Sequence, residues 1–226
     1  MKLPKSVADY RRMAAYLIAK HPRDKAMELM VGGGIGDYDN VGKAEADLLE
    51  EIGLAPGQLV IDLGCGSGRL STQLAKRYGP EIKYVGIDVV PELIAFARER
   101  AEPSYDFHLT DGTHIPATDA SADIVLAFSV MTHLRTKDAK RYIREAHRAL
   151  KYGGLLVFSF LESREGKLAY FKRKIVERVE RAAVETHFQS AKIVTSWADQ
   201  FGFAVQSIIP PDRIGQNVAV LQKKPT

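Results

Sequence analysis

The sequence contains a single cysteine, Cys65, so an internal disulfide bond is excluded and the cysteine usage is compatible with a reducing compartment. Long apolar runs are also missing, because no stretch approaches the length of about eighteen residues that a membrane-spanning helix needs. The amino terminus lacks an apolar signal core followed by a small-residue cleavage site. From these absences we expect a cytoplasmic protein without a membrane span.

Charge of one sign is present in only slight excess, with 32 Lys and Arg residues against 28 Asp and Glu residues and a net charge of +4. This balance permits an anionic substrate but does not indicate nucleic-acid binding. The sequence shows no arginine-rich tail, zinc knuckle or RNA-binding module, and no H-x-x-x-H spacing or carboxylate cluster. We therefore expect neither a nucleic-acid partner nor a metal site, and nothing in the sequence indicates an oligomeric state.

The 226 residues are 46% apolar and 27% charged, which is ordinary for a globular protein with one main domain. Short apolar runs alternate with helical patterns, and this alternation predicts an α/β fold with a doubly wound, mostly parallel sheet. The segment 210–216 between the last two runs holds no helix, so we expect an antiparallel pair there. The predicted strands are 59–63, 83–88, 105–109, 123–128, 155–160, 203–209 and 217–222.

The most informative stretch is a short apolar run, residues 59–63, followed by the alternating glycines Gly64, Gly66 and Gly68. The run is too short for a helix and is typical of a buried strand. Glycines let a ligand approach the backbone because they have no Cβ. The helix predicted for residues 69–78 directs its free N–H groups at the same turn. The stretch therefore predicts a nucleotide-type cofactor site.

The spacing of the glycines and acids narrows the kind of cofactor. A dinucleotide fingerprint needs a glycine at position 69, where this chain has Arg69. Asp62 precedes the first glycine by two residues and suits a ligand with an ammonium group. Asp88 ends the next predicted strand, about twenty residues beyond the turn, where an acid can bind a ribose diol.

The order of these motifs, D-x-G-C-G-x-G over residues 62–68 and then an acid after the second strand, resembles the class I S-adenosylmethionine (SAM)-dependent methyltransferases. The resemblance covers roughly residues 45 to 224. It implies a Rossmann-like seven-stranded methyltransferase sheet with an antiparallel last strand, SAM as the cofactor, and methyl transfer as the reaction. In that reading Asp62 organises the ammonium region, Asp88 binds the ribose hydroxyls and Val89 packs on the adenine.

The same resemblance implies contacts from the later strands. Asp111 would accept a hydrogen bond from the exocyclic amine, Gly112 would keep its loop close, and Ser129 would lie near the methionine end. Cys65 is expected to pack beneath the cofactor rather than to act as a nucleophile, since no His is near it in sequence. The complete set of candidate cofactor residues is Asp62, Gly64, Cys65, Gly66, Gly68, Asp88, Val89, Asp111, Gly112 and Ser129.

His133 is the best candidate for a general base, because it follows the fourth predicted strand and imidazole titrates near neutrality. The alternative is a histidine that only packs at the entry of the next helix. His187 is a weaker candidate, and the remaining histidines do not cluster.

The acceptor is expected to be a small molecule. The segment 128–131 reads Phe-Ser-Val-Met and not the Asn/Asp-Pro-Pro-aromatic turn of amino-group methyltransferases that act on adenine, cytosine or glutamine. We therefore place oxygen ahead of nitrogen or carbon as the methylated atom. Two alternatives stay open: an NAD-dependent oxidoreductase, and a non-catalytic SAM- or RNA-binding protein.

Two segments flank or interrupt the predicted sheet. Residues 1–44 are expected to form an N-terminal helical cap or lid, with a helix over 5–20 and a glycine-rich loop over 31–42 that is either a linker or a closing lid. Residues 45–226 would form the SAM-binding domain. An insert at about 162–200 is long enough to hold helices of its own. Its basic face is either a lid for an anionic substrate or a solvated helix surface.

Overall fold

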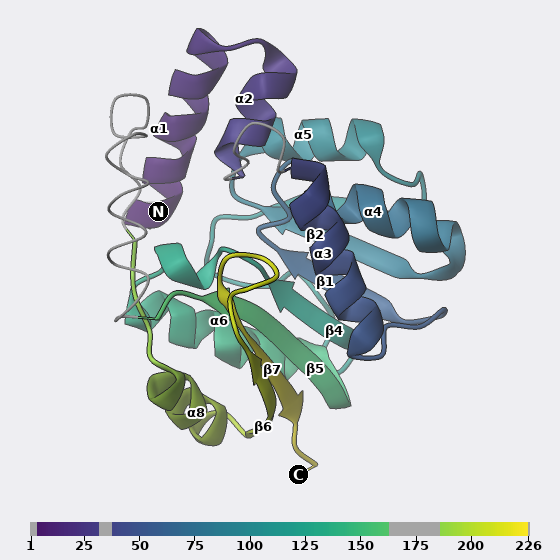
Figure 1. The fold of residues 1–226 in the computed structure, drawn as a ribbon, viewed down its shortest axis with the longest axis vertical. Coiled ribbons are helices and arrows are strands. Elements are labelled where there is room, and N and C mark those ends of the chain that lie inside the picture. The colour runs from purple at the N-terminus through teal and green to yellow at the C-terminus, as the bar shows by residue number, and fades with distance from the viewer. Residues whose placement is uncertain (1–3, 32–37, 163–185, 226) are drawn as a thin grey trace.

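A computed structural model of the chain describes residues 4–31, 38–162 and 186–225. Its centre is a seven-stranded sheet with the order β3-β2-β1-β4-β5-β7-β6 (Figure 1). The expected doubly wound α/β class is confirmed. The strands are β1 (Leu59–Leu63), β2 (Lys83–Asp88), β3 (Asp106–Leu109), β4 (Ala122–Ala127), β5 (Leu150–Phe160), β6 (Phe203–Ile209) and β7 (Asn217–Lys223).

The strand order reverses beside β1, which pairs in parallel with β2 on one side and with β4 on the other. The crevice outside the carboxyl ends of these strands is where doubly wound sheets bind their ligands. Strand β7 runs antiparallel to both β5 and β6, as the short connection between the last two strands predicts. The reversal point therefore puts the ends of β1, β2 and β4 next to one another.

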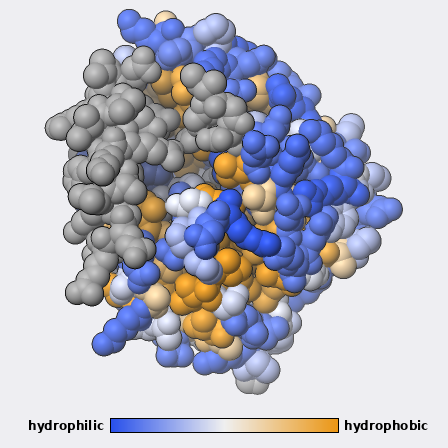
Figure 2. All heavy atoms as spheres, viewed as in Figure 1, coloured by the Kyte–Doolittle hydropathy of each residue, from blue (hydrophilic) through white to orange (hydrophobic). Residues whose placement is uncertain are grey.

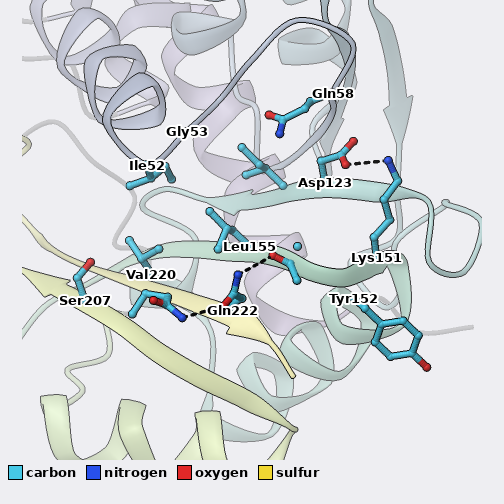
Figure 3. A pocket seen from close by; sticks show the side chains of 14 residues that line it. Ile52, Gly53, Gln58, Asp123, Lys151, Tyr152, Leu155, Ser207, Val220 and Gln222 are labelled. Atoms are coloured by element: carbon cyan, nitrogen blue, oxygen red, sulfur yellow. Dashed lines mark hydrogen bonds and ion pairs between the residues drawn. The ribbon is translucent and has the colours of Figure 1, made fainter. Parts of the chain in front are cut away.

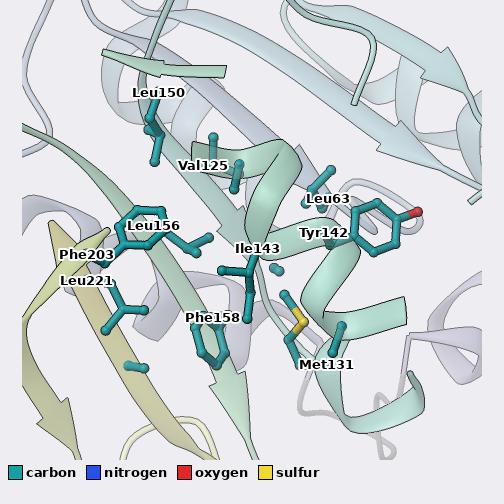
Figure 4. Close-up of a cluster of buried hydrophobic side chains, with 14 of the residues drawn as sticks. Leu63, Val125, Met131, Tyr142, Ile143, Leu150, Leu156, Phe158, Phe203 and Leu221 are labelled. Carbon is teal, nitrogen blue, oxygen red and sulfur yellow. The ribbon is translucent and has the colours of Figure 1, made fainter. Parts of the chain in front are cut away.

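Helices cover both faces of the sheet. One face packs against α3 (Tyr38–Glu51), α4 (Arg69–Tyr78) and α5 (Pro91–Arg100), and the other packs against α6 (Thr136–Ala149) and α8 (Ala191–Gln200). Successive side chains of β5 point to opposite faces of the sheet. Leu156 and Phe158 pack in the core with α6, while Val157 packs in the core on the other face. Figure 4 shows Ile143 of α6 beside Leu156 and Phe158, and Tyr142 of the same helix beside Leu63. Short 3-10 turns lie at Gly79–Glu81 (η1) and Met131–His133 (η2).

The amino-terminal helices form a separate layer at one end of the sheet. Helices α1 (Lys5–Lys20) and α2 (Arg23–Met30) pack as a pair, with Met13, Leu17 and Met27 fully or almost fully buried. These side chains join Leu93 and Phe96 of α5 in one apolar cluster. Figure 1 shows the pair above the ends of α5 and β2. Burial of this apolar surface fixes α1 and α2 against the sheet domain.

The structure corrects several boundaries. Residues 38–42 begin α3 and are not part of a loop, because Gly42 is pressed against the backbone of α4, where a Cβ would lie 2.8 Å from the Arg69 carbonyl oxygen. Helix α2 was not predicted. Strand β5 begins at Leu150 and not at the predicted residue 155, so Gly153 and Gly154 lie inside it. The rest of the glycine-rich segment and most of the basic insert, residues 32–37 and 163–185, fall outside the described residues.

Two surface properties complete the fold. Among the helices in the described ranges, none combines the length and apolar character needed to cross a bilayer. Figure 2 shows apolar side chains gathered over the β5, β7 and β6 end of the sheet, while hydrophilic side chains dominate over α4 and α5. The amphipathic helices thus turn their polar sides to solvent.

Candidate functional site

The glycine turn adopts a backbone that requires glycine. Gly64, Gly66 and Gly68 have φ values of +70°, +60° and +85°, in the left-handed region that side chains with a Cβ disfavour. A Cβ on Gly64 would clash with Val130, and one on Gly66 would clash with Val31. The turn is therefore enclosed by one valine from the end of α2 and one from the segment after β4.

The turn is also tied to β2. The N–H groups of Gly64 and Cys65 donate to the carbonyl oxygen of Ile87 at 2.7 and 3.1 Å. The Cys65 thiol is buried beside Gly86, and this burial raises its pKa well above the usual value. A protonated, enclosed thiol is a poor nucleophile, so the geometry favours a packing role for Cys65.

Asp88 connects the glycine turn to the start of α5. One of its oxygens, Oδ2, accepts from the Gly66 N–H at 3.0 Å, and Oδ1 accepts from Val89 and Val90 at 2.7 and 2.9 Å. Burial raises the pKa of Asp88, while these three N–H donors oppose the shift. A carboxylate offers about four lone-pair positions, so one on Oδ2 remains for a further donor. That arrangement fits a ribose hydroxyl.

Asp62 lies beneath the same turn in β1. Its Oδ2 accepts from the Tyr84 hydroxyl at 2.7 Å, and the side chain is almost completely buried. Burial raises the pKa of Asp62 to about 7, against the opposing hydrogen bond from Tyr84. No donor in the described ranges engages Oδ1. An ammonium group beside it would favour the ionised form, so the acceptor Oδ1 fits the amino end of SAM.

The end of β3 contributes Asp111 and Gly112. The Asp111 Oδ1 atom accepts from the backbone N–H and the hydroxyl of Thr113 at 3.0 and 2.5 Å, and these bonds lower the pKa of Asp111. Gly112 has φ +82°, and a Cβ there would lie 2.7 Å from Val7 and 3.6 Å from Val89. The expected adenine-side residues Val89 and Gly112 are thus brought close together.

Helix α1 reaches the site from the amino-terminal layer. The Arg11 Nε atom donates to the carbonyl oxygen of Val89 at 2.8 Å, and Val7 contacts the Gly112 position. The Tyr10 ring meets the ring of His133 edge-on, with centroids 5.3 Å apart. Nothing in the sequence pointed to these three residues, because they lie about eighty positions or more from their partners.

A buried ion pair attaches α2 and α3 to the start of α4. Arg69 pairs with Glu45 through both Nε and Nη2, and its Nη1 donates to the carbonyl oxygen of Val31 at 3.2 Å. The Tyr38 hydroxyl lies 3.1 Å from both oxygens of Ser67 in the glycine turn. The residue that breaks the dinucleotide fingerprint therefore fixes Val31 over Gly66.

The segment after β4 holds Ser129 and the candidate base. Ser129 has φ +58°, which costs a residue with a Cβ about 1–2 kcal/mol. His133 ends the turn η2, and the backbone N–H of His187 donates to the Thr132 carbonyl at 2.7 Å. The two histidines considered as bases thus come from segments that are hydrogen-bonded to each other.

A hollow of about 520 Å³ lies at the other end of the parallel strands, near the starts of β4 and β5 (Figure 3). Two contacts in its lining are the 2.7 Å ion pair between Lys151 and Asp123 and the hydrogen bond that the Gln222 side chain donates to the Gly153 carbonyl. Within the described ranges no group of three His, Cys, Asp or Glu side chains is placed to hold a metal ion. The candidate functional residues therefore lie at the carboxyl ends of the strands.

The structure brings the sequence-predicted cofactor residues into one chain of contacts. Gly66 is hydrogen-bonded to Asp88, Val89 lies beside Gly112, and Gly64 lies against Val130, which follows Ser129. Their roles toward SAM stay predictions, but their positions at the ends of β1 to β4 agree with the site expected from sequence.

Comparison with known proteins gives a family match. Residues 60–154 match a family model described as a methyltransferase domain. The chain is 30% identical over 183 residues to phosphoethanolamine N-methyltransferase 1 of Arabidopsis thaliana, covering 79% of this chain and 35% of that protein. It is 32% identical over 162 residues to the ubiquinone biosynthesis O-methyltransferase of Ruegeria pomeroyi, covering 69% and 62%. The chain thus spans less than two thirds of the length of these relatives.

Among solved structures, magnesium protoporphyrin IX methyltransferase from Synechocystis PCC 6803 with bound S-adenosylhomocysteine (SAH) has a TM-score of 0.67 to this chain. The two are 19% identical, and the match covers 89% of this chain and 93% of that one. At this identity the likeness concerns the fold.

Proposed function

We propose that this chain, whose residues 60–154 match a methyltransferase domain, is a class I SAM-dependent methyltransferase that transfers the methyl group of SAM to a small-molecule acceptor, with oxygen ahead of nitrogen or carbon as the methylated atom. The observation that supports this proposal most is the meeting of the left-handed glycine turn with Asp62 and Asp88 at the reversal point of the sheet.

The proposed binding roles follow from the donors and acceptors that each residue leaves open. Asp62 binds the ammonium group with Oδ1, and Asp88 binds a ribose hydroxyl with its remaining lone pair. Gly64, Gly66 and Gly68 give the turn its left-handed backbone, and the positions where a Cβ would stand are filled by Val130, Val31 and Ala97. Cys65 packs under the turn.

On the adenine side, Val89 and Gly112 enclose the ring from two loops that are already in contact. Asp111 keeps Oδ2 for the exocyclic amine while Thr113 occupies its Oδ1. The carbonyl of Val89 is engaged by Arg11, which fixes this wall of the site to α1.

Methyl transfer from a sulfonium is an in-line displacement, so the chain mainly has to align the acceptor atom. Alignment alone can supply effective molarities of roughly 10⁵–10⁸ M. When the acceptor must lose a proton, His133 removes it, and general-base catalysis adds about 10²–10⁴-fold. The edge of the Tyr10 ring against His133 limits the rotation of the imidazole.

The acceptor class rests on the residues after β4. They lack the Asn/Asp-Pro-Pro-aromatic turn of enzymes that methylate amino groups of adenine, cytosine or glutamine. The names of the relatives include both an N-methyltransferase and an O-methyltransferase, so they do not select the atom. The net charge of +4 is compatible with an anionic acceptor.

The two alternatives have less support. An NAD-dependent oxidoreductase does not suit Arg69 at the third glycine position or the antiparallel β7. A non-catalytic SAM- or RNA-binding protein was suggested only by the basic insert, most of which lies outside the described residues.

Calorimetric titration with SAM and SAH tests the proposal directly, and binding of both is expected. SAH release is then measured with a catechol as the oxygen acceptor and phosphoethanolamine as the nitrogen acceptor. A folded protein that binds neither SAM nor SAH, shown to be folded by circular dichroism, would refute the function. Turnover of phosphoethanolamine alone would overturn the preference for oxygen while leaving the reaction class intact.

A further inference from the structure

Ser129, Ser159 and Gln216 form a closed ring of hydrogen bonds. Ser129, which has a positive φ, takes part with both its backbone N–H and its side chain. The Ser129 backbone N–H donates to Ser159 Oγ at 2.6 Å. The Ser159 hydroxyl donates to Gln216 Oε1 at 2.8 Å, and Gln216 Nε2 donates back to Ser129 Oγ at 2.9 Å. The ring joins the ends of β4 and β5 to the residue just before β7.

The directions of these hydrogen bonds determine which hydroxyl hydrogen has no acceptor within the ring. Ser159 is fully buried and uses its one hydroxyl hydrogen on Gln216. Ser129 Oγ receives a hydrogen from Gln216 and gives none to the ring, and no acceptor for its own hydrogen occurs in the described ranges. A serine hydroxyl has one hydrogen and two lone pairs, so Ser129 is presented as a donor.

The position of Ser129 indicates what it donates to. The next residue, Val130, touches the Gly64 position of the glycine turn. Ser129 is only partly buried, whereas its ring partner Ser159 has no exposed surface. Under the proposed function, the neighbouring glycine turn holds the methionine end of SAM, whose one anionic group is a carboxylate.

We propose that Ser159 and Gln216 are positioning residues that hold Ser129 in its left-handed conformation and direct its hydroxyl hydrogen to the SAM carboxylate. The inference rests on the proposed function, since it needs SAM in this site. Strained backbone that is held in place by surrounding hydrogen bonds is concentrated at ligand sites. The ring explains why Ser129 keeps a positive φ without being glycine.

The test compares SAM with decarboxylated SAM, which keeps the ammonium group and lacks only the carboxylate. Both ligands are titrated calorimetrically into the wild-type chain and into the S129A variant. We expect SAM to bind about tenfold more tightly than decarboxylated SAM to the wild type, as for a hydrogen bond to a charged group. In S129A this difference is expected to shrink to about twofold or less.

Q216E tests the positioning role. A carboxylate has no hydrogen to donate, so Ser129 must turn its hydrogen into the ring to keep the contact. We expect Q216E to retain its melting temperature, to lose about tenfold in SAM affinity and to bind decarboxylated SAM as before. Q206E is the matched control. Gln206 lies on the exposed edge strand β6 and donates a hydrogen bond to Gln222 of β7, away from the ring.

The outcomes separate the two proposals. If the wild type binds neither ligand, the proposed function fails. If SAM binds but the difference from decarboxylated SAM persists in S129A, or if Q216E weakens both ligands equally, the positioning role is wrong. S129G is the second variant in case S129A does not fold, because glycine adopts a φ of +58° without strain. This variant is expected to be as stable as the wild type and to lose the same selectivity as S129A.

Discussion

The Tyr84 hydroxyl donates a 2.7 Å hydrogen bond to Asp62 Oδ2, and both side chains are almost completely buried beneath the glycine turn. The two residues sit on adjacent parallel strands, with Tyr84 paired to Val60 and Asp62 to Gly86. Tyr84 in turn stacks on Tyr105 with ring centroids 5.0 Å apart. The packing of Tyr84 therefore affects the protonation state of Asp62, an acid of the proposed cofactor site.

Replacing Tyr84 by Phe removes this donor while keeping the ring. Because the hydrogen bond lowers the pKa of Asp62, its loss is expected to raise that pKa above about 7. We expect Y84F to weaken SAM binding near neutral pH and to recover part of the affinity at higher pH. Titration calorimetry across pH measures both effects, and a pH profile identical to that of the wild type would contradict the coupling.

SAM binding itself is expected to depend on pH. Below about pH 7 Asp62 carries a proton in the folded protein, and an ammonium group beside it favours release of that proton. Affinity should therefore rise between about pH 6 and pH 8, with a proton released on binding. Calorimetry in buffers of different ionisation enthalpy detects this proton. Asp62→Asn is the control and should abolish the release.

The same group makes a signed contribution to stability. Asp62 has a pKa of about 7 in the folded chain against 3.8 for an ordinary Asp, so the folded state holds one more proton between these values. The free energy of unfolding contributed by this group therefore falls as pH rises from about 4 to 7. Denaturant unfolding of the wild type and of Asp62→Asn should show a difference in this window, and parallel curves would exclude the contribution.

Asp88→Ala removes a carboxylate that accepts from three N–H groups and is proposed to bind the ribose. We expect SAM affinity to fall by more than about 1 kcal/mol, with a measurable loss of stability because buried donors lose their acceptor. Asp88→Asn keeps an acceptor for the N–H groups and is expected to cost less stability. Unchanged affinity in both variants would show that the ribose lies elsewhere.

Gly66→Ala tests the enclosure of the turn. The new Cβ would clash with Val31 and also meets a φ of +60°. We expect the variant to be destabilised by about 1–3 kcal/mol. Adding Val31→Ala removes the clash but not the backbone strain, so the double variant should recover only part of the loss. Full recovery, measured by denaturant unfolding, would show that the positive φ carries no cost.

His133→Ala tests the proposed base once an acceptor has been found. A loss of about 10²–10⁴-fold in kcat with unchanged SAM affinity is expected when the acceptor must be deprotonated. His147→Ala is a suitable control, because burial lowers the pKa of His147 and its ring packs against Phe203, under Gly202. An unchanged rate in His133→Ala would show that His133 does not act as a base and that catalysis comes from alignment of the acceptor alone.

Local sequence was sufficient for the centre of the sheet. Residues 59–63, 69–78 and 83–88 carry short apolar runs, glycines and helical spacing that agree with one another, and their bounds match β1, α4 and β2. The same locality explains why Asp62 and Asp88 could be selected as candidates, since Asp62 is next to last in β1 and Asp88 is the last residue of β2.

What the sequence could not predict depends on contacts between distant segments. Tyr38 to Gly42 resembles a loop in composition, yet packing on α4 makes it helical. Ser159 and Gln216 meet Ser129 across 30 and 87 positions, and no local pattern indicates such a ring. Arg11 and Tyr10 are ordinary residues of an amphipathic helix until the fold places them on Val89 and His133.

Helix α1 contacts both ends of the site, through Arg11 on the Val89 carbonyl and through Tyr10 on His133. One helix of sixteen residues therefore contacts both the proposed adenine wall and the proposed base. Any tilt of that element to admit one molecule also shifts the walls that meet the other. A substitution that loosens α1 is therefore expected to disturb both the segment at Val89 and the position of His133, although neither residue belongs to that helix.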